Sequence, residues 1–159
     1  MATISSKPVY LSLLLALLCQ LLPWSGISLI LRPEFLLLTI LYWTLRAPHL
    51  CNIGTAWFAG ILMDLISGGL FGQFALAYTL TSYIAVTYQR RLALFDIWQQ
   101  AGYVFLLLLL AQLTTLIMKV FAGGELFGWQ YFLPSITGIL LWLFMMLSPF
   151  TIVSHSSRN

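Results

Sequence analysis

The stretch WQQAGYVFLLLLLAQLTTLIMKV at residues 98–120 decides the fold class. At about 1.5 Å per residue in a helix, this stretch reaches about 34 Å, enough to cross the roughly 30 Å hydrocarbon core of a bilayer. It contains the uninterrupted apolar run Phe105–Leu110. The stretch therefore predicts a transmembrane helix.

The composition of the whole chain agrees with this prediction. The 159 residues are 61% hydrophobic and only 7% charged, and the mean hydropathy is +0.98. Soluble domains are about 45–50% apolar and 25% charged. We therefore expect an integral membrane protein in which residues 1–159 form a single membrane domain. Any soluble activity would belong to a partner protein.

Apolar segments on both sides of residues 98–120 complete an all-α, polytopic helix bundle. We predict six transmembrane helices, with five as the alternative. Segments of 12 to 16 residues in the first half fall below the usual span of about 20, so they must extend into their flanks, be shielded by neighbours or be partly re-entrant. The other five predicted spans are Val9–Leu22, Glu34–Leu45, Asn52–Ser67, Phe71–Tyr88 and Trp129–Ile152, the last of them broken by Pro134, Gly138 and Pro149.

The basic residues predict the orientation, because cytoplasmic loops of membrane proteins are enriched in lysine and arginine. Six spans with the N-terminus in the cytoplasm place five basic residues inside and two outside. Both termini are then cytoplasmic. The inner residues are Lys7, Arg46, Arg90, Arg91 and Arg158, and the outer ones are Arg32 and Lys119.

Asp64 is a carboxylate within an otherwise apolar run. It belongs to a set of residues spaced four apart, here called the ladder, which consists of Gly60, Asp64, Gly68 and Gly72. The four-residue spacing stacks these residues on one side of a helix. Glycines allow another backbone to approach closely, and an intramembrane carboxylate needs a partner or water. The ladder is therefore interpreted as a packing surface, either inside the protein or against a partner helix.

Two hypotheses address the partner of Asp64. Arg32 lies in the first outer loop, at a similar predicted depth and with the opposite charge, so the two residues could form an ion pair. A proton or cation site is the alternative, because intramembrane carboxylates often serve transport. It is disfavoured because no second carboxylate shares the helix of Asp64.

Other classes of function find little support in the sequence. The basic residues do not cluster as nucleic-acid binding requires. Neither His49 nor His155 has a partner at metal-ligand spacing, and Cys19 and Cys51 lie in apolar segments and favour packing. No catalytic set, phosphate-binding loop or cofactor motif is present, which predicts a protein without enzymatic activity.

The motif Trp98-Gln99-Gln100 opens the predicted span over residues 98–120 at the cytoplasmic face. An indole suits the headgroup region of a bilayer. Adjacent side chains project about 100° apart on a helix, so at least one of the two glutamines should point towards protein. We favour a role in fixing the loop over contact with a partner.

Read in chain order, these motifs closely resemble the MreD family of rod shape-determining proteins of Gram-negative bacteria. The resemblance covers nearly the whole chain, and the glycine-aspartate ladder combined with Trp-Gln-Gln is its most specific part. The motifs are Arg32-Pro33, Leu41-Tyr42-Trp43, Pro48-His49, the ladder from Gly60 to Gly72, and Trp98-Gln99-Gln100-Ala101.

The resemblance implies a non-enzymatic inner-membrane subunit of the elongation complex that builds the lateral wall of rod-shaped cells. It implies association with the bitopic protein MreC. Together they would link MreB filaments, indirectly, to the peptidoglycan synthase RodA and penicillin-binding protein 2. The candidates for an interaction or a structural role are Arg32, Pro33, Gly60, Asp64, Gly68, Gly72, Trp98, Gln99 and Gln100.

The predicted fold is also similar to the six-helix substrate-binding subunits of energy-coupling-factor vitamin transporters. This similarity supplies the rival hypothesis, a small-molecule binding subunit of a transporter. The outer loops argue against it, because they offer few of the polar groups that a vitamin pocket needs.

Overall fold

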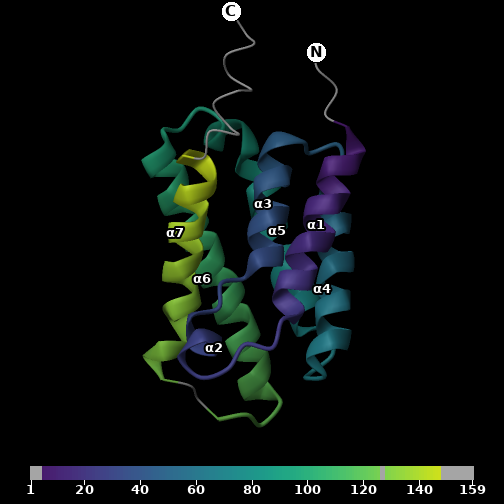
Figure 1. Ribbon diagram of the computed structural model, residues 1–159, viewed down its shortest axis with the longest axis vertical. Coiled ribbons are helices and arrows are strands. Elements are labelled where there is room, and N and C mark those ends of the chain that lie inside the picture. Colours follow the sequence, from purple (N-terminus) through teal and green to yellow (C-terminus); the bar gives the residue numbers. More distant parts are fainter. Residues whose placement is uncertain (1–4, 126–127, 148–159) are drawn as a thin grey trace, which may run out of the picture.

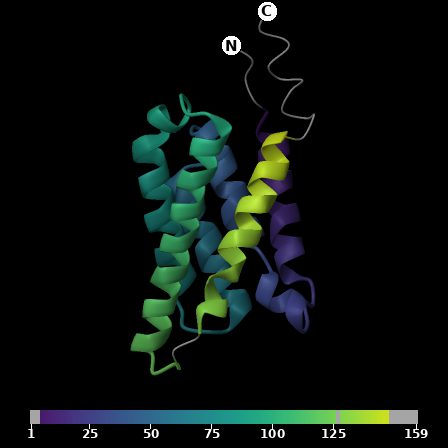
Figure 2. The same ribbon diagram turned by 90° about the vertical axis from the view of Figure 1, so that its left-hand side faces the viewer.

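Six long helices run along the molecule and alternate in direction (Figures 1 and 2). The computed structural model describes residues 5–125 and 128–147, apart from the side chains of residues 29 and 30. All regular elements in these ranges are helical, which confirms the predicted all-α bundle. The long helices are α1 (Ser6–Leu21), α3 (Phe35–Arg46), α4 (Ile53–Ser67), α5 (Gln73–Leu92), α6 (Ile97–Phe121) and α7 (Leu133–Leu147). The short ones are α2 (Ile27–Leu31) and the 3-10 helix η1 (Trp129–Phe132).

The two ends of the bundle are distinguished by their connections (Figure 1). At the end we call the Asp64 end, lower in Figure 1, α4 turns into α5, α2 leads into α3, and α6 leads through η1 into α7. At the opposite end, called the Arg46 end, α3 turns into α4 and α5 turns into α6. Helix α1 begins and α7 ends at the Arg46 end.

Helix α3 is central, and it packs against α1, α4, α5 and α7. Its 12 residues reach only about 18 Å, less than the thickness of a hydrocarbon core. Half of them are buried, and Leu37, Ile40 and Leu41 are fully so. The neighbouring helices therefore shield this short helix, which is one of the arrangements that short helices require in a membrane.

Two helical segments are long and apolar enough to cross a membrane by themselves. They are α6, with 25 residues, and Trp129–Leu147, with 19 residues. Helices α1, α3 and α4 are apolar but shorter. Large apolar side chains are nevertheless exposed on the outer faces of α1, α4, α6 and α7, including Leu11, Leu15, Phe58, Leu65, Leu106, Leu140 and Phe144. Such faces suit contact with lipid or with apolar partner helices.

The helix bounds differ from the prediction in several places, and α1 begins at Ser6 rather than Val9. Helix α2 was not predicted, α5 ends at Leu92 rather than Tyr88, and α7 begins at Leu133 after the turn η1. Pro134 interrupts nothing, because it lies in the first turn of α7, where its missing N–H has no helical partner to lose. Pro149, His155 and Arg158 lie outside the described residues.

Cys51, in the connection between α3 and α4, is fully buried. Its thiol donates to the carbonyl oxygen of Ile40 at 3.6 Å and accepts from the hydroxyl of Thr44 at 3.8 Å. Burial raises the pKa of the Cys51 thiol to about 11. Cys51 thus packs as an uncharged thiol, in line with the interpretation of a packing cysteine.

Candidate functional site

Asp64 lies in the last turn of α4 and caps the first turn of α5. Its Oδ2 accepts hydrogen bonds from the backbone N–H groups of Gly72 at 3.0 Å and Ala75 at 3.1 Å, and its Oδ1 accepts from Phe74 at 2.9 Å. The first N–H groups of a helix have no partner within the helix, and the positive end of the helix dipole favours a negative charge there. Asp64, only 2% exposed, thus finds its partner in the backbone of the next helix.

Gly60 lies one turn before Asp64 on the same face of α4. A Cβ atom at this position would meet the Cα of Ala75 at 2.5 Å and the carbonyl oxygen of Phe74 at 2.7 Å. Only a residue without a side chain lets the backbone of α5 come this close. Gly60 provides the approach that allows Asp64 to reach the N–H groups, so the two residues form one structural unit.

The other two members of the ladder do not continue this face, and the prediction of a four-residue helical stack is wrong. Helix α4 ends at Ser67, and Gly68 is its C-cap with φ +63°. Gly72 precedes α5 with φ +99°. Both have left-handed backbones, which glycine adopts without strain. The four-residue spacing arises here from one helix face followed by a tight turn.

The hypothesised ion pair between Arg32 and Asp64 is also not formed within the described residues, because Asp64 is bound by backbone N–H groups. Arg32 follows α2, and Pro33 and Glu34 lead into α3. The Glu34 carboxylate accepts a hydrogen bond from the hydroxyl of Tyr78 on α5 at 2.9 Å. Arg32 and Lys119 are close enough to act on the charge of Glu34.

A second set of polar contacts joins α6 to η1 and α7 at the same end of the bundle. The hydroxyls of Thr115 and Tyr131 lie 2.8 Å apart. The hydroxyl of Ser135 donates to the buried amide oxygen of Gln112 at 2.6 Å. The ammonium of Lys119 lies 5.2 Å from the centre of the Tyr131 ring, a favourable cation–π geometry. The Asp64 end is thus held together by polar groups from most of the helices that meet there.

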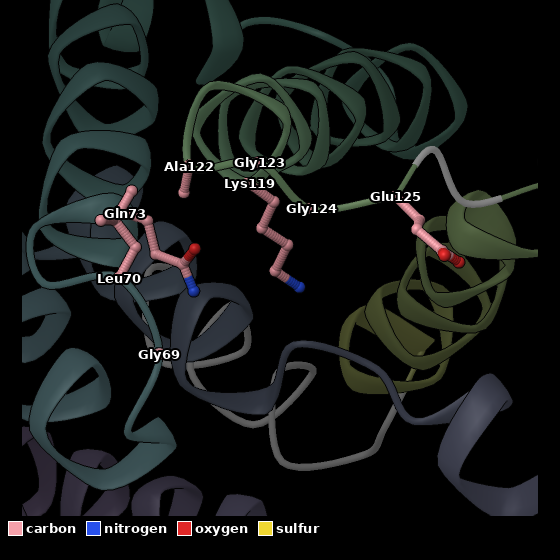
Figure 3. A pocket seen from close by; sticks show the side chains of 8 residues that line it. All are labelled: Gly69, Leu70, Gln73, Lys119, Ala122, Gly123, Gly124 and Glu125. Atoms are coloured by element: carbon pink, nitrogen blue, oxygen red, sulfur yellow. The ribbon is translucent and has the colours of Figure 1, made fainter.

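A cavity of about 350 Å³ opens at this end, between the α4–α5 connection and the end of α6 (Figure 3). One wall is made of Gly69, Leu70 and Gln73, and the other of Lys119 and residues 122–125. Gly123, with φ +84°, ends α6, and the N–H of Gly124 donates to the carbonyl oxygen of Lys119 at 2.9 Å. This glycine ending of α6 gives the second wall its shape.

The Trp98-Gln99-Gln100 motif lies at the Arg46 end, away from the cavity (Figure 1). Trp98 is 76% exposed, as an interfacial anchor would be, and Gln99 is exposed. The amide of Gln100 donates to the carbonyl oxygen of Leu92, the last residue of α5, at 3.5 Å. Gln100 therefore ties the start of α6 to the end of α5, which fixes the loop between them. Gln99 points away from the protein.

Sequence reasoning missed the polar set formed by Glu34, Tyr78, Gln112, Tyr131 and Ser135. Glu34 and Tyr131 were predicted to lie at a membrane interface, and Tyr78, Gln112 and Ser135 were not singled out. The sequence did contain a signal, because Gln112 and Thr115 are polar residues within the apolar run of α6. Polar side chains that are buried in a helix bundle need hydrogen-bond partners. The spacing of these residues in the chain could not show which helices would supply the partners.

Comparison with known proteins decides the family, because the model of the rod shape-determining protein MreD family matches residues 3–148. The chain belongs to the MreD family. The rod shape-determining protein MreD of Haemophilus influenzae is 29% identical to it over 133 residues, which cover 84% of this chain and 82% of that protein. No solved structure matches the chain.

Membership of the MreD family confirms the resemblance read from the motifs. MreD proteins are membrane proteins of the rod shape-determining system, and the family is one of shape-determining structural proteins rather than a known enzyme family. The similarity to vitamin transporter subunits stays a prediction.

Proposed function

We propose that this chain is a scaffold subunit of the elongation complex in the bacterial inner membrane. It presents membrane-embedded surfaces to an MreC-like bitopic protein and to the RodA and penicillin-binding protein 2 pair. MreB filaments are reached indirectly, through the MreC-like protein. The chain itself carries out no chemical step, and its effect on wall synthesis is organisational.

The observation that carries this proposal is that buried polar groups of the chain form hydrogen bonds between its own helices. Asp64 binds the backbone of α5, and Glu34 binds Tyr78. These contacts join helices to one another and leave large apolar side chains on the outside. A body held together in this way offers fixed apolar surfaces, as a scaffold in a membrane requires.

We also propose that residues 1–159 form one membrane domain with both termini in the cytoplasm. Among the described residues, four basic side chains lie at the Arg46 end, which are Lys7, Arg46, Arg90 and Arg91. Arg32 and Lys119 lie at the Asp64 end. This difference supports a cytoplasmic Arg46 end.

Within this proposal the candidate residues divide into two groups. Gly60 and Asp64 are buried and have a structural role. Arg32 and Pro33 are half-buried and also have a structural role, where the chain enters α3. Gly68 and Gly72 lie in the turn between α4 and α5, and Gly68 is exposed, as are Trp98 and Gln99 at the other end. The exposed residues are the ones that a partner can touch.

Affinity purification of the tagged chain from its native membrane, followed by mass spectrometry, tests the proposal. We expect recovery of MreC-like protein, RodA and penicillin-binding protein 2. The Gly68→Asn variant tests the turn as a contact, because asparagine tolerates the left-handed backbone that leucine would strain. Loss of partners from a correctly inserted Gly68→Asn variant would assign the turn to the interface, and retention at wild-type yield would exclude it.

A second candidate function is a small-molecule binding subunit of a transporter. The cavity of about 350 Å³ at the Asp64 end favours it, because ligand sites are commonly cavities of about 300–1,000 Å³. In the same purification, a co-purifying ATPase module without wall-synthesis proteins would support transport and contradict the scaffold proposal.

A further inference from the structure

The side chain of Gln73 lines the cavity at the Asp64 end. Gln73 is the first residue of α5 and is 3% exposed. Within residues 5–125 and 128–147 its side chain forms no hydrogen bond. Among the described residues, the fully buried polar atoms without a partner are Ser82 Oγ and Trp142 Nε1, so the Gln73 amide keeps some exposure, and it faces the cavity. The amide of Gln73 is therefore poised to bind something that is not part of the chain.

The amide points into the cavity described above. Figure 3 shows the Gln73 amide and the Lys119 ammonium extending into the space between the two walls. Glycine forms much of the remaining lining, at Gly69, Gly123 and Gly124, so that little side-chain volume fills this space. The cavity volume of about 350 Å³ is enough for a small polar molecule or a lipid headgroup.

The charges of the lining define the chemistry of the ligand. Lys119 supplies a positive charge and Glu125 a negative one. Outside the lining, Arg32 and Lys119 both act on Glu34, whose carboxylate is already hydrogen-bonded to Tyr78. A ligand with a single negative or positive charge would match only part of this balanced set, whereas a group that carries both charges matches it as a whole.

We propose that this cavity binds a zwitterionic group that combines an ammonium with a phosphate or carboxylate. Lys119 binds the anionic oxygens, Glu125 binds the ammonium, and the Gln73 amide donates a hydrogen bond to the anionic group. Such a group can be the headgroup of an aminophospholipid or a soluble zwitterion. The assignment is independent of the scaffold role, because it concerns the purified chain alone.

Two probes distinguish the sources on the full-length protein in detergent. Native mass spectrometry measures retention of phosphatidylethanolamine against phosphatidylglycerol, which has the phosphate but no ammonium. Isothermal titration calorimetry measures binding of free phosphoethanolamine. We expect the wild-type protein to bind at least one zwitterionic probe, and to prefer phosphatidylethanolamine over phosphatidylglycerol if the source is a lipid.

Matched variants connect this binding to the cavity. Gln73→Leu and Lys119→Met should each weaken zwitterion binding by about tenfold or more, because each removes a charge-assisted hydrogen bond. The controls are Gln99→Leu and Lys7→Met, which change exposed residues at the Arg46 end and should bind as the wild type does. Gln73→Leu should melt near the wild-type temperature, because the amide makes no hydrogen bond within the described residues.

Three results would overturn the assignment. The first is failure of the wild-type protein to bind either zwitterionic probe. The second is equal retention of phosphatidylglycerol and phosphatidylethanolamine without binding of free phosphoethanolamine. The third is equal binding by the cavity variants and their controls. If Gln73→Leu fails to fold, then the amide has a structural role and the assignment is also wrong. Glu125→Gln provides a separate check, since it should reduce the preference for phosphatidylethanolamine.

Discussion

At the scale of single residues, Asp64 and Gly60 secure the contact between α4 and α5 by different means. Gly60 contributes by having no side chain, and Asp64 contributes two oxygens that accept three hydrogen bonds. A buried carboxylate is expensive unless it is hydrogen-bonded, and backbone N–H groups at a helix start are suitable donors. The charge of Asp64 is thus explained without a second ionised side chain.

Replacing Asp64 by asparagine should destabilise the protein by about 2 kcal/mol. Asparagine keeps one acceptor oxygen but places an NH₂ group against N–H donors and removes the charge that the helix start favours. Thermal unfolding in detergent measures the effect. Asp96→Asn is the matched control, because Asp96 precedes α6, is exposed and makes no side-chain cap hydrogen bond. An equal shift in both variants would contradict the capping role.

Thermal unfolding also tests whether Asp64 is bound by backbone N–H groups alone or also by Arg32. If Arg32 does not pair with Asp64, the effects of Arg32→Gln and Asp64→Asn should add within about 0.5 kcal/mol in the double variant. A coupling well above that value would restore the ion pair that the structure lacks.

Replacing Gly60 by alanine should destabilise the protein by about 1–3 kcal/mol, as overpacking at a tight backbone contact does. The added methyl would lie within 3 Å of backbone atoms of Phe74 and Ala75, which cannot rotate away. Gly102→Ala is the control, since Gly102 lies in α6 with nothing within 4 Å, and alanine there should stabilise the helix by about 0.5–1 kcal/mol. In thermal unfolding, we expect Gly60→Ala to lower the melting temperature and Gly102→Ala to raise it.

The sequence identified Asp64 as unusual but could not identify its partner. Backbone N–H groups are common to every residue, so a carboxylate that binds them leaves no second signal in the sequence. Arg32 was proposed because charge and predicted depth were the only visible clues. The glycines after Asp64 did hold information, because two glycines four residues apart also fit a tight turn between two helices.

At the scale of helices, α3 is short and is fixed at its N-terminal end by side chains of other helices. The amide oxygen of Gln20, on α1, accepts a hydrogen bond from the N–H of Phe35 at 3.2 Å. Glu34, the residue before α3, binds Tyr78 on α5. The first residues of α3 are thereby positioned from two sides, which compensates for the few turns that this helix contributes.

Replacing Tyr78 by phenylalanine should lower stability by about 1.5–3 kcal/mol, because it leaves the half-buried Glu34 carboxylate without its hydroxyl donor. Tyr83→Phe removes the same hydroxyl from an exposed position on the same helix, and its effect should stay within about 0.5 kcal/mol. Chemical or thermal denaturation of both variants tests this. A Tyr78→Phe variant as stable as the wild type would show that the bond between α5 and the start of α3 contributes nothing.

Helix existence was predictable to a large extent, and helix ends less so. Apolar segments marked all six long helices, since burial in lipid and in the core both demand apolar side chains. Gly68 and Gly72 were wrongly assigned to the same helix face as Gly60 and Asp64. A spacing of four residues is compatible both with a helix and with a turn that begins at Gly68. Helix α2 escaped notice because five residues carry no periodic signal.

At the scale of the whole molecule, the six long helices bring the start of α1 and the end of α7 to the same end. An even number of crossings places these two points on one side of a membrane. The orientation can therefore be tested at the two ends of α6, which lie at opposite ends of the bundle.

Single cysteines at exposed positions should report this orientation. In a background with Cys19→Ser and Cys51→Ser, the Phe121→Cys variant lies at the Asp64 end and Leu94→Cys at the Arg46 end, at positions that are 83% and 87% exposed. A membrane-impermeant maleimide added to spheroplasts should label Phe121→Cys, and should label Leu94→Cys only after lysis. The reverse pattern would invert the topology, and labelling of both before lysis would contradict alternate crossing.

The cap on α5 also has a consequence for biogenesis. The N–H groups that bind Asp64 lie 8, 10 and 11 residues later in the chain, so they do not exist as partners while α4 alone has left the ribosome. A 15-residue helix with a bare carboxylate is a poor candidate for entering lipid alone. We therefore expect the insertion machinery to release α4 and α5 together as a helical hairpin, so that Asp64 acts as a checkpoint in the assembly of the nascent chain.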